Sequence, residues 1–96
     1  MHVLVSYDVS TETKGGKNRL RRVAQTCLNF GQRVQKSVFE CAVNEVQYER
    51  LVHALLDCIE EEEDSLRIYR LREPKEEFIQ HFGRNEPIDF EGPLVI

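Results

Sequence analysis

The stretch of sequence that decides the fold is Val3-Leu4-Val5-Ser6-Tyr7-Asp8-Val9, a short apolar run of the kind that forms a buried strand. It carries one acidic residue, Asp8, near its end. An acid at the exit of a buried strand costs free energy unless a cation or a set of hydrogen-bond donors pairs with it. Asp8 is therefore the first residue to explain, either as a site residue or as a cap on the following loop.

The residues after this strand predict a helix and then a short β-rich segment. Apolar residues recur at helical spacing over residues 20–28, and Gly31 is a stop signal for that helix. Residues 33–43 are rich in β-forming types and predict either one bent strand or two brief strands around a tight turn near Lys36-Ser37. Periodicity leaves both alternatives open.

The second half of the chain predicts one more helix and one more strand. Asn44 followed by Gln47 resembles a capping box, and an apolar stripe then runs over residues 48–59. The acidic run 60–64 should end this helix, because acids near a helix C-terminus oppose its dipole. We expect this run to be a solvated loop, followed by a strand over residues 66–71.

The predicted order of elements indicates an α+β fold, the ferredoxin-like βαββαβ sandwich. Two helices would cover one face of the sheet, and the other face would be solvated or buried against a partner. We expect residues 1–72 to form the core and residues 73–96 to form an extension with a short helix near 75–82. The apolar end, Leu94-Val95-Ile96, has no place in a four-stranded sheet and is expected to pair with a second chain.

Composition limits the classes of protein to consider. A chain of 96 residues is one domain, and it has no apolar run near the ~20 residues of a membrane span. The first residues lack a signal-peptide pattern, so we expect a cytoplasmic protein with no membrane partner. The three cysteines are widely spaced without a C-x-x-C pair, which indicates buried thiols rather than disulfides or zinc ligands.

Charge is distributed unevenly along the chain, although the net charge is only −4. Seven bases and no acid lie between Lys14 and Lys36, whereas eight acids and one base lie between Glu45 and Asp64. Such a chain can present one positive surface to a polyanion, because local potential steers a partner more than net charge does. The alternative is an ordinary solvated helix face. We predict phosphate contacts to nucleic acid, without base readout, from Lys14, Lys17, Arg19, Arg22, Arg33 and Lys36.

Asp8 alone is a weak metal site, since Mg²⁺ is usually held by one or two carboxylates plus waters and substrate phosphates. A two-fold homodimer would bring both copies of Asp8 to one interface. Metal-assisted phosphodiester hydrolysis would then be reasonable chemistry. Ser37, on the predicted middle strand, is a candidate to hold a water or phosphate near Asp8. Phe39, which shares its face, is by default a core residue or half of a dimer contact.

Three segments together resemble the second core CRISPR-associated protein family, the small subunit of the spacer-acquisition machinery. The resemblance covers residues 1–72 closely, and the tail matches in character only. Its segments are Val3-Leu4-Val5-Ser6-Tyr7-Asp8, Gly31-x-Arg33-Val34-Gln35-x-Ser37-Val38-Phe39-Glu40, and Ser65-Leu66-Arg67-Ile68-Tyr69-Arg70-Leu71.

The resemblance implies a symmetric homodimer whose C-terminal strand extends the partner's sheet. It also implies a metal-dependent endonuclease acting on RNA or double-stranded DNA, with Asp8 as ligand of Mg²⁺ or Mn²⁺ and with Ser37 and Phe39 beside the same dimer groove. Members of the family also bind the prespacer duplex through basic residues and bridge two dimers of the CRISPR integrase. In that adaptor role, catalysis is dispensable.

Overall fold

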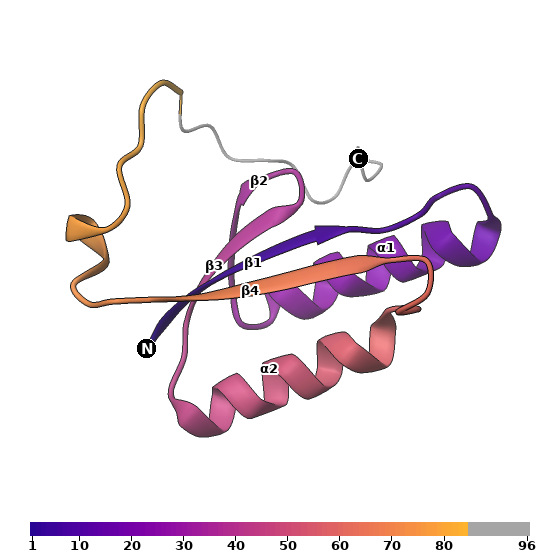
Figure 1. Ribbon diagram of the computed structural model, residues 1–96, viewed down its shortest axis with the longest axis horizontal. Coiled ribbons are helices and arrows are strands. Elements are labelled where there is room, and N and C mark those ends of the chain that lie inside the picture. The colour runs from indigo at the N-terminus through magenta and orange to yellow at the C-terminus, as the bar shows by residue number, and fades with distance from the viewer. Residues whose placement is uncertain (85–96) are drawn as a thin grey trace.

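The computed structural model describes residues 1–84, whose arrangement is drawn in Figure 1. The element order is βαββαβ followed by a 3-10 turn, which confirms the predicted ferredoxin-like α+β fold. The elements are β1 (His2–Asp8), α1 (Lys14–Leu28), β2 (Gly31–Gln35), β3 (Val38–Ala42), α2 (Glu45–Cys58), β4 (Ser65–Leu71) and η1 (Lys75–Glu77). The predicted strand at residues 94–96 lies outside the described residues, so its pairing with a second chain stays a prediction.

The four strands form one antiparallel sheet in the order β2-β3-β1-β4. β1 is central, and its Val5 lies opposite Phe39 of β3 and Ile68 of β4. Of the two alternatives for residues 33–43, two separate strands joined by a tight turn are observed. A register shift between Arg33 and Gln35 interrupts the pairing of β2 with β3.

The core lies between the two helices and one face of the sheet. Successive side chains of a strand point to opposite faces, so the buried residues of β1 alternate with Leu4, Ser6 and Asp8. The helices leave this second face uncovered, and Asp8 lies at one end of it. The largest fully buried side chains of the core are Phe39, Leu51, Leu55, Val3, Val5, Val23, Cys27 and Cys41.

Local hydrogen bonds define where the helices begin. Thr13 caps α1 by accepting a bond from the Gly16 N–H at 3.0 Å. The predicted capping box of α2 is present: the Asn44 side chain accepts from the Gln47 N–H at 2.8 Å, and Gln47 Oε1 accepts from the Asn44 N–H at 2.9 Å. α2 ends at Cys58, just before the acidic run, as predicted.

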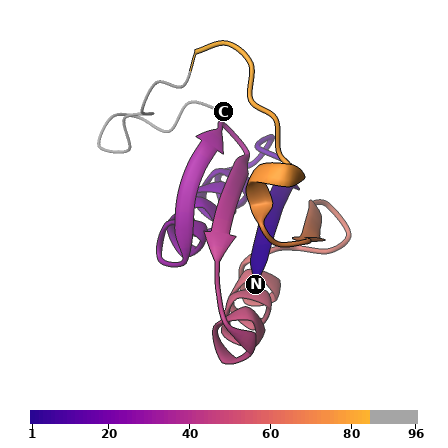
Figure 2. The same cartoon turned by 90° about the vertical axis from the view of Figure 1, so that its left-hand side faces the viewer.

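The segment after β4 is less helical than the sequence indicated. Residues 75–82 were expected to form a short helix, but only the three-residue turn Lys75–Glu77 is observed, in front of the strands in Figure 2. Its N-cap residue, Pro74, makes no side-chain capping bond, and helices this short are not stable by themselves. Lys75 Nζ lies 3.6 Å from Glu40 Oε1, which places this segment over the part of the sheet remote from Asp8.

The cysteines have the buried, unpaired state that their spacing predicted. Cys27, Cys41 and Cys58 are all free and buried. Burial raises the pKa of Cys27 to about 12 and that of Cys41 to about 11, so both remain thiols at neutral pH. Among residues 1–84, no helix is long and apolar enough to cross a membrane.

Candidate functional site

Asp8 ends β1 on the uncovered face of the sheet, opposite Ser65 of β4. Its side chain is exposed, and no hydrogen bond or ion pair within residues 1–84 involves the carboxylate. The expectation that Asp8 needs a partner to offset burial is therefore corrected. Strand alternation directs Asp8 away from the helices, so its carboxylate stays hydrated and is available to a ligand.

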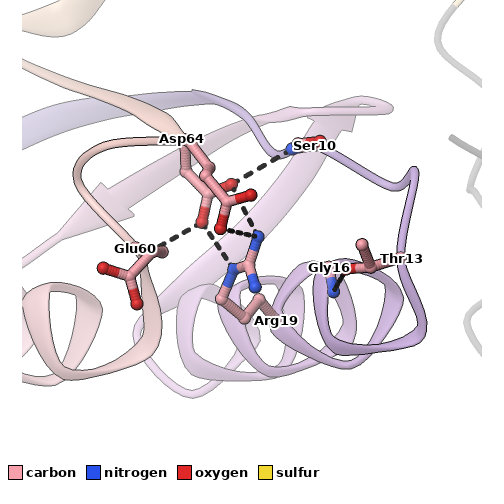
Figure 3. A network of polar contacts seen from close by, with 7 residues as sticks. Ser10, Thr13, Gly16, Arg19, Glu60 and Asp64 are labelled. Atoms are coloured by element: carbon pink, nitrogen blue, oxygen red, sulfur yellow. Dashed lines mark hydrogen bonds and ion pairs between the residues drawn. The ribbon is translucent and has the colours of Figure 1, made fainter.

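The buried acid of this region is Asp64, in the turn between α2 and β4. Its side chain is 0% exposed and accepts bonds from Arg19 Nε at 2.8 Å and Arg19 Nη2 at 3.3 Å. It also accepts bonds from the Ser10 N–H at 3.1 Å and the Glu60 N–H at 2.9 Å. Figure 3 shows how these donors converge on one carboxylate from three parts of the chain.

The network changes the acidity of Asp64. Burial by itself would raise the pKa of Asp64, but the Arg19 hydrogen bond and the Glu60 and Ser10 N–H groups outweigh it and hold the pKa below its ordinary value. The prediction that residues 60–64 form a solvated loop is thus wrong for Asp64. Nothing in the composition of the acidic run distinguishes this residue; the available signal was its place directly before a strand.

Ser37 lies in the turn between β2 and β3 rather than on a strand, which corrects its predicted placement. Its carbonyl oxygen accepts a bond from the Tyr7 N–H at 3.1 Å. Because Tyr7 precedes Asp8, this contact holds the Ser37 turn beside the end of β1. The structure therefore brings Ser37 close to the Asp8 end of the strand.

Phe39 does not share the face of Asp8. It is 0% exposed in the core, where its ring stacks with that of Tyr7 at a centroid distance of 6.2 Å. Since Phe39 pairs with Val5, strand alternation places it on the helix side of the sheet and Asp8 on the other. The interpretation of Phe39 as a core residue is confirmed, and its place beside a dimer groove stays a prediction.

The predicted nucleic-acid residues fall into two groups. Those with exposed side chains are Lys14, Lys17, Arg22 and Lys36, and Arg21 is exposed as well. The other two bases are less exposed and make contacts within the fold. Arg19 is only 17% exposed and is bound to Asp64, with Glu63 Oε2 at 3.6 Å. The Arg33 guanidinium lies 5.1 Å from the centre of the Phe39 ring. The accessible positive charge is therefore on α1 and at the β2–β3 turn.

A metal ion would find only part of its ligands in one protomer. Within residues 1–84, no cluster of three or more His, Cys, Asp or Glu side chains could hold an ion. Asp8 supplies one exposed carboxylate with unused oxygen atoms, which fits the oxygen preference of Mg²⁺. The donor set is compatible with a site completed by a second protomer, by waters and by substrate phosphates.

The known proteins of similar sequence carry one family name. The family model described as "CRISPR associated protein Cas2" matches residues 1–78. The "CRISPR-associated endoribonuclease Cas2 1" of Moorella thermoacetica is 66% identical over 96 residues, which is all of both chains. The "CRISPR-associated endonuclease Cas2" of Halalkalibacterium halodurans is 50% identical and covers 99% of each chain.

Solved structures resemble the whole described fold. The crystal structure of Streptococcus pyogenes Cas2 at pH 6.5 matches with a TM-score of 0.77 and 46% identity, over 86% of this chain and 100% of that chain. A structure of the hypothetical protein TT1823 from Thermus thermophilus matches with a TM-score of 0.72 and 28% identity, over 88% of this chain and 93% of that chain.

Proposed function

Because the chain belongs to the Cas2 family of CRISPR-associated proteins, we propose that it is an antiviral-defence endonuclease that hydrolyses phosphodiester bonds. The observation that carries the proposal is the position of Asp8, an exposed carboxylate at the end of the central strand. Since relatives are named both endoribonuclease and endonuclease, RNA and double-stranded DNA are the two substrate classes to compare.

The proposed active form is a homodimer that pairs the uncovered faces of two sheets. A two-fold axis near the end of β1 would bring the second Asp8 to the same place. Two carboxylates, waters and phosphate oxygens make a suitable set for Mg²⁺, and Mn²⁺ shares that preference for oxygen. When bound, the ion would polarise the phosphate and lower the pKa of a bound water.

The chain's own residues would position this chemistry. The pairing of β1 with β4 holds Asp8 opposite Ser65, at the exposed end of the sheet. The hydroxyl of Ser37, in the neighbouring turn, is available to hydrogen-bond a substrate phosphate or a water. No base hydrogen-bonds to Ser37 among residues 1–84, so we assign it a binding role rather than that of a nucleophile.

The test is cleavage of a labelled DNA duplex and a matched single-stranded RNA with Mg²⁺, Mn²⁺ or EDTA. We expect wild-type protein to cleave at least one substrate only with metal, and Asp8→Ala to lower the rate at least about 100-fold. Asp57→Ala is the control, because Asp57 is an exposed aspartate on α2 with its side chain 70% exposed. Wild-type cleavage rates in Asp8→Ala, or undiminished cleavage in EDTA, would refute the catalytic assignment.

A second candidate function is a DNA-binding adaptor that bridges two dimers of the CRISPR integrase. The observation in its favour is α1, which contains no acidic residue and exposes Lys14, Lys17, Arg21 and Arg22. Phosphate contacts from such a surface position a duplex without reading its sequence. In this role Asp8→Ala would bind a duplex and bridge the integrase dimers as wild-type protein does, so bridging retained without cleavage separates the adaptor from the nuclease.

A further inference from the structure

We propose that Asp64 and Arg19 are a positioning pair. Together they hold the end of β1, where Asp8 lies, beside the start of β4. This inference rests on the proposed function of Asp8, and it assigns no contact with substrate to either residue. Its basis is that the network in Figure 3 connects the chain just after Asp8 to the residue just before Ser65, the cross-strand partner of Asp8.

The hydrogen bonds of Asp64 lie at the ends of β1 and β4 that carry Asp8 and Ser65. Ser10, whose N–H donates to Asp64, is two residues beyond Asp8 on the exit of β1. Asp64 directly precedes Ser65, which is the cross-strand partner of Asp8. One buried carboxylate therefore connects the exit of β1 to the entrance of β4. The Asp8–Ser65 pair is the last of that ladder, so without this connection it would be the first to separate.

The connection through Asp64 is rigid. Arg19 reaches Asp64 from α1 with two N–H groups, and the Glu60 N–H donates to the same carboxylate from the turn that follows α2. Because the Asp64 side chain is 0% exposed, water does not compete for these bonds, and charge-assisted bonds of this kind are strong. The Asp64 carboxylate is thus held in one orientation by groups from α1, from the loop after β1 and from its own turn.

Ser10 also makes a contact that is independent of Asp64. A Cβ atom added at Gly16 of α1 would overlap the Ser10 carbonyl oxygen, so helix and loop are in close contact there. Ser10 is therefore held by its N–H through Asp64 and by its carbonyl against α1. Groups that support a metal ligand typically contribute 10–100-fold to affinity or activity, so the position of Asp8 should depend on this network.

The test compares wild-type protein with Asp64→Asn and a matched control, Asn44→Ala. Asparagine keeps the shape of the side chain but removes its charge and one acceptor. The control removes the capping box at the opposite end of α2, whose contact with β4, Glu45 Oε1 to Arg70 Nη2 at 3.5 Å, lies at the far end of that strand from Ser65. In Asp64→Asn we expect amide hydrogen exchange at Ser10 to accelerate at least about tenfold, whereas Val5 in the central ladder accelerates only as far as the loss of global stability requires.

Two further measurements separate a positioning role from a merely structural one. The Mn²⁺ concentration that half-broadens the Asp8 amide signal should rise about 10–100-fold in Asp64→Asn and stay constant in Asn44→Ala. On the substrate that wild-type protein cleaves, kcat should fall by a similar factor with KM within about twofold. Unchanged Mn²⁺ response and kcat in Asp64→Asn, despite faster Ser10 exchange, would overturn the proposal.

If Asp64→Asn does not fold, Arg19→Lys replaces it in the same measurements. Lysine keeps the charge and leaves the backbone N–H hydrogen bonds to Asp64 in place, but it lacks the bidentate contact of the guanidinium group. We expect the same changes at smaller amplitude, and wild-type values for the Mn²⁺ response and kcat would again overturn the proposal. A wild-type protein that cleaves neither substrate would refute the proposed nuclease, whereas the Mn²⁺ response at Asp8 would still decide the positioning role.

Discussion

At the scale of single residues, Asp8 and Asp64 illustrate how the direction of a side chain determines its chemistry. Asp8 is the last residue of β1 and points to the uncovered face, where its carboxylate is hydrated. Asp64 lies close to it, just before the paired strand, but its carboxylate is buried among four N–H donors. The exposed carboxylate is free to bind a ligand, and the buried one is committed to the fold.

The lowered pKa of Asp64 predicts an acid-dependent contribution to stability. In the folded protein Asp64 binds its proton less readily than in the unfolded chain, so its contribution is complete above the ordinary value of 3.8. The contribution is lost as the pH falls through the lower folded-state pKa. We expect Asp64→Asn to lower the free energy of unfolding by about 2 to 3 kcal/mol at pH 7. Urea unfolding at pH 7, 5 and 3 measures this difference, which should shrink only in the most acidic sample.

A constant difference between the two proteins from pH 7 to pH 3 would contradict this assignment. It would mean that the pKa of Asp64 is the same in the folded and unfolded states. Asp57→Asn serves as the control, since its exposed carboxylate should leave the pH dependence of stability unchanged.

At the scale of elements, the first turn of α1 contains two adjacent glycines in different surroundings. A Cβ at Gly16 would overlap the Ser10 carbonyl oxygen, whereas a Cβ at Gly15 would meet only Arg19 Nη1 at 3.6 Å and Thr13 Oγ1 at 3.7 Å. We expect Gly16→Ala to destabilise the protein by about 1–3 kcal/mol through overpacking. Gly15→Ala should raise stability by about 0.5–1 kcal/mol, because alanine favours the helix. Urea unfolding of both variants measures the two changes in stability. Equal changes would contradict the difference in surroundings between the two glycines.

Contacts within one element were predictable from the sequence, whereas contacts between distant elements were not. The capping box of Asn44 and Gln47 was predictable because both partners lie within one turn of helix. The role of Arg19 depends on a contact between segments far apart in the sequence. Arg19 and Asp64 are 45 residues apart, and the spacing of charges in a sequence does not indicate which basic residue of a helix meets a distant turn. Local sequence signals thus predicted the helices and strands, whereas tertiary contacts determined the roles of the side chains.

At the scale of the whole molecule, the two helices give the helical layer a basic part and an acidic part. α1 and α2 lie side by side in Figure 1 and contact one another. α1 carries no acid, whereas α2 contains three acids, Glu45, Glu49 and Asp57, and is followed by the acidic run 60–64. A duplex bound by this protein should therefore contact α1 and avoid α2, since phosphates are attracted to one and repelled by the other.

This asymmetry predicts the effect of removing charge on each helix. The double variant Lys17→Gln/Arg22→Gln removes two exposed bases of α1 that form no ion pair within residues 1–84. Each phosphate contact contributes about −0.9 to the slope of log affinity against log salt concentration, so the double variant should bind more weakly with a slope shallower by about 1.8. Arg50→Gln is the matched control, because Arg50 is exposed on α2 and should not face the duplex. Fluorescence anisotropy of a labelled duplex across a salt series measures both quantities. An unchanged slope in the double variant, or an equal change in Arg50→Gln, would contradict binding through α1, because the counterions released on binding would then come from another surface.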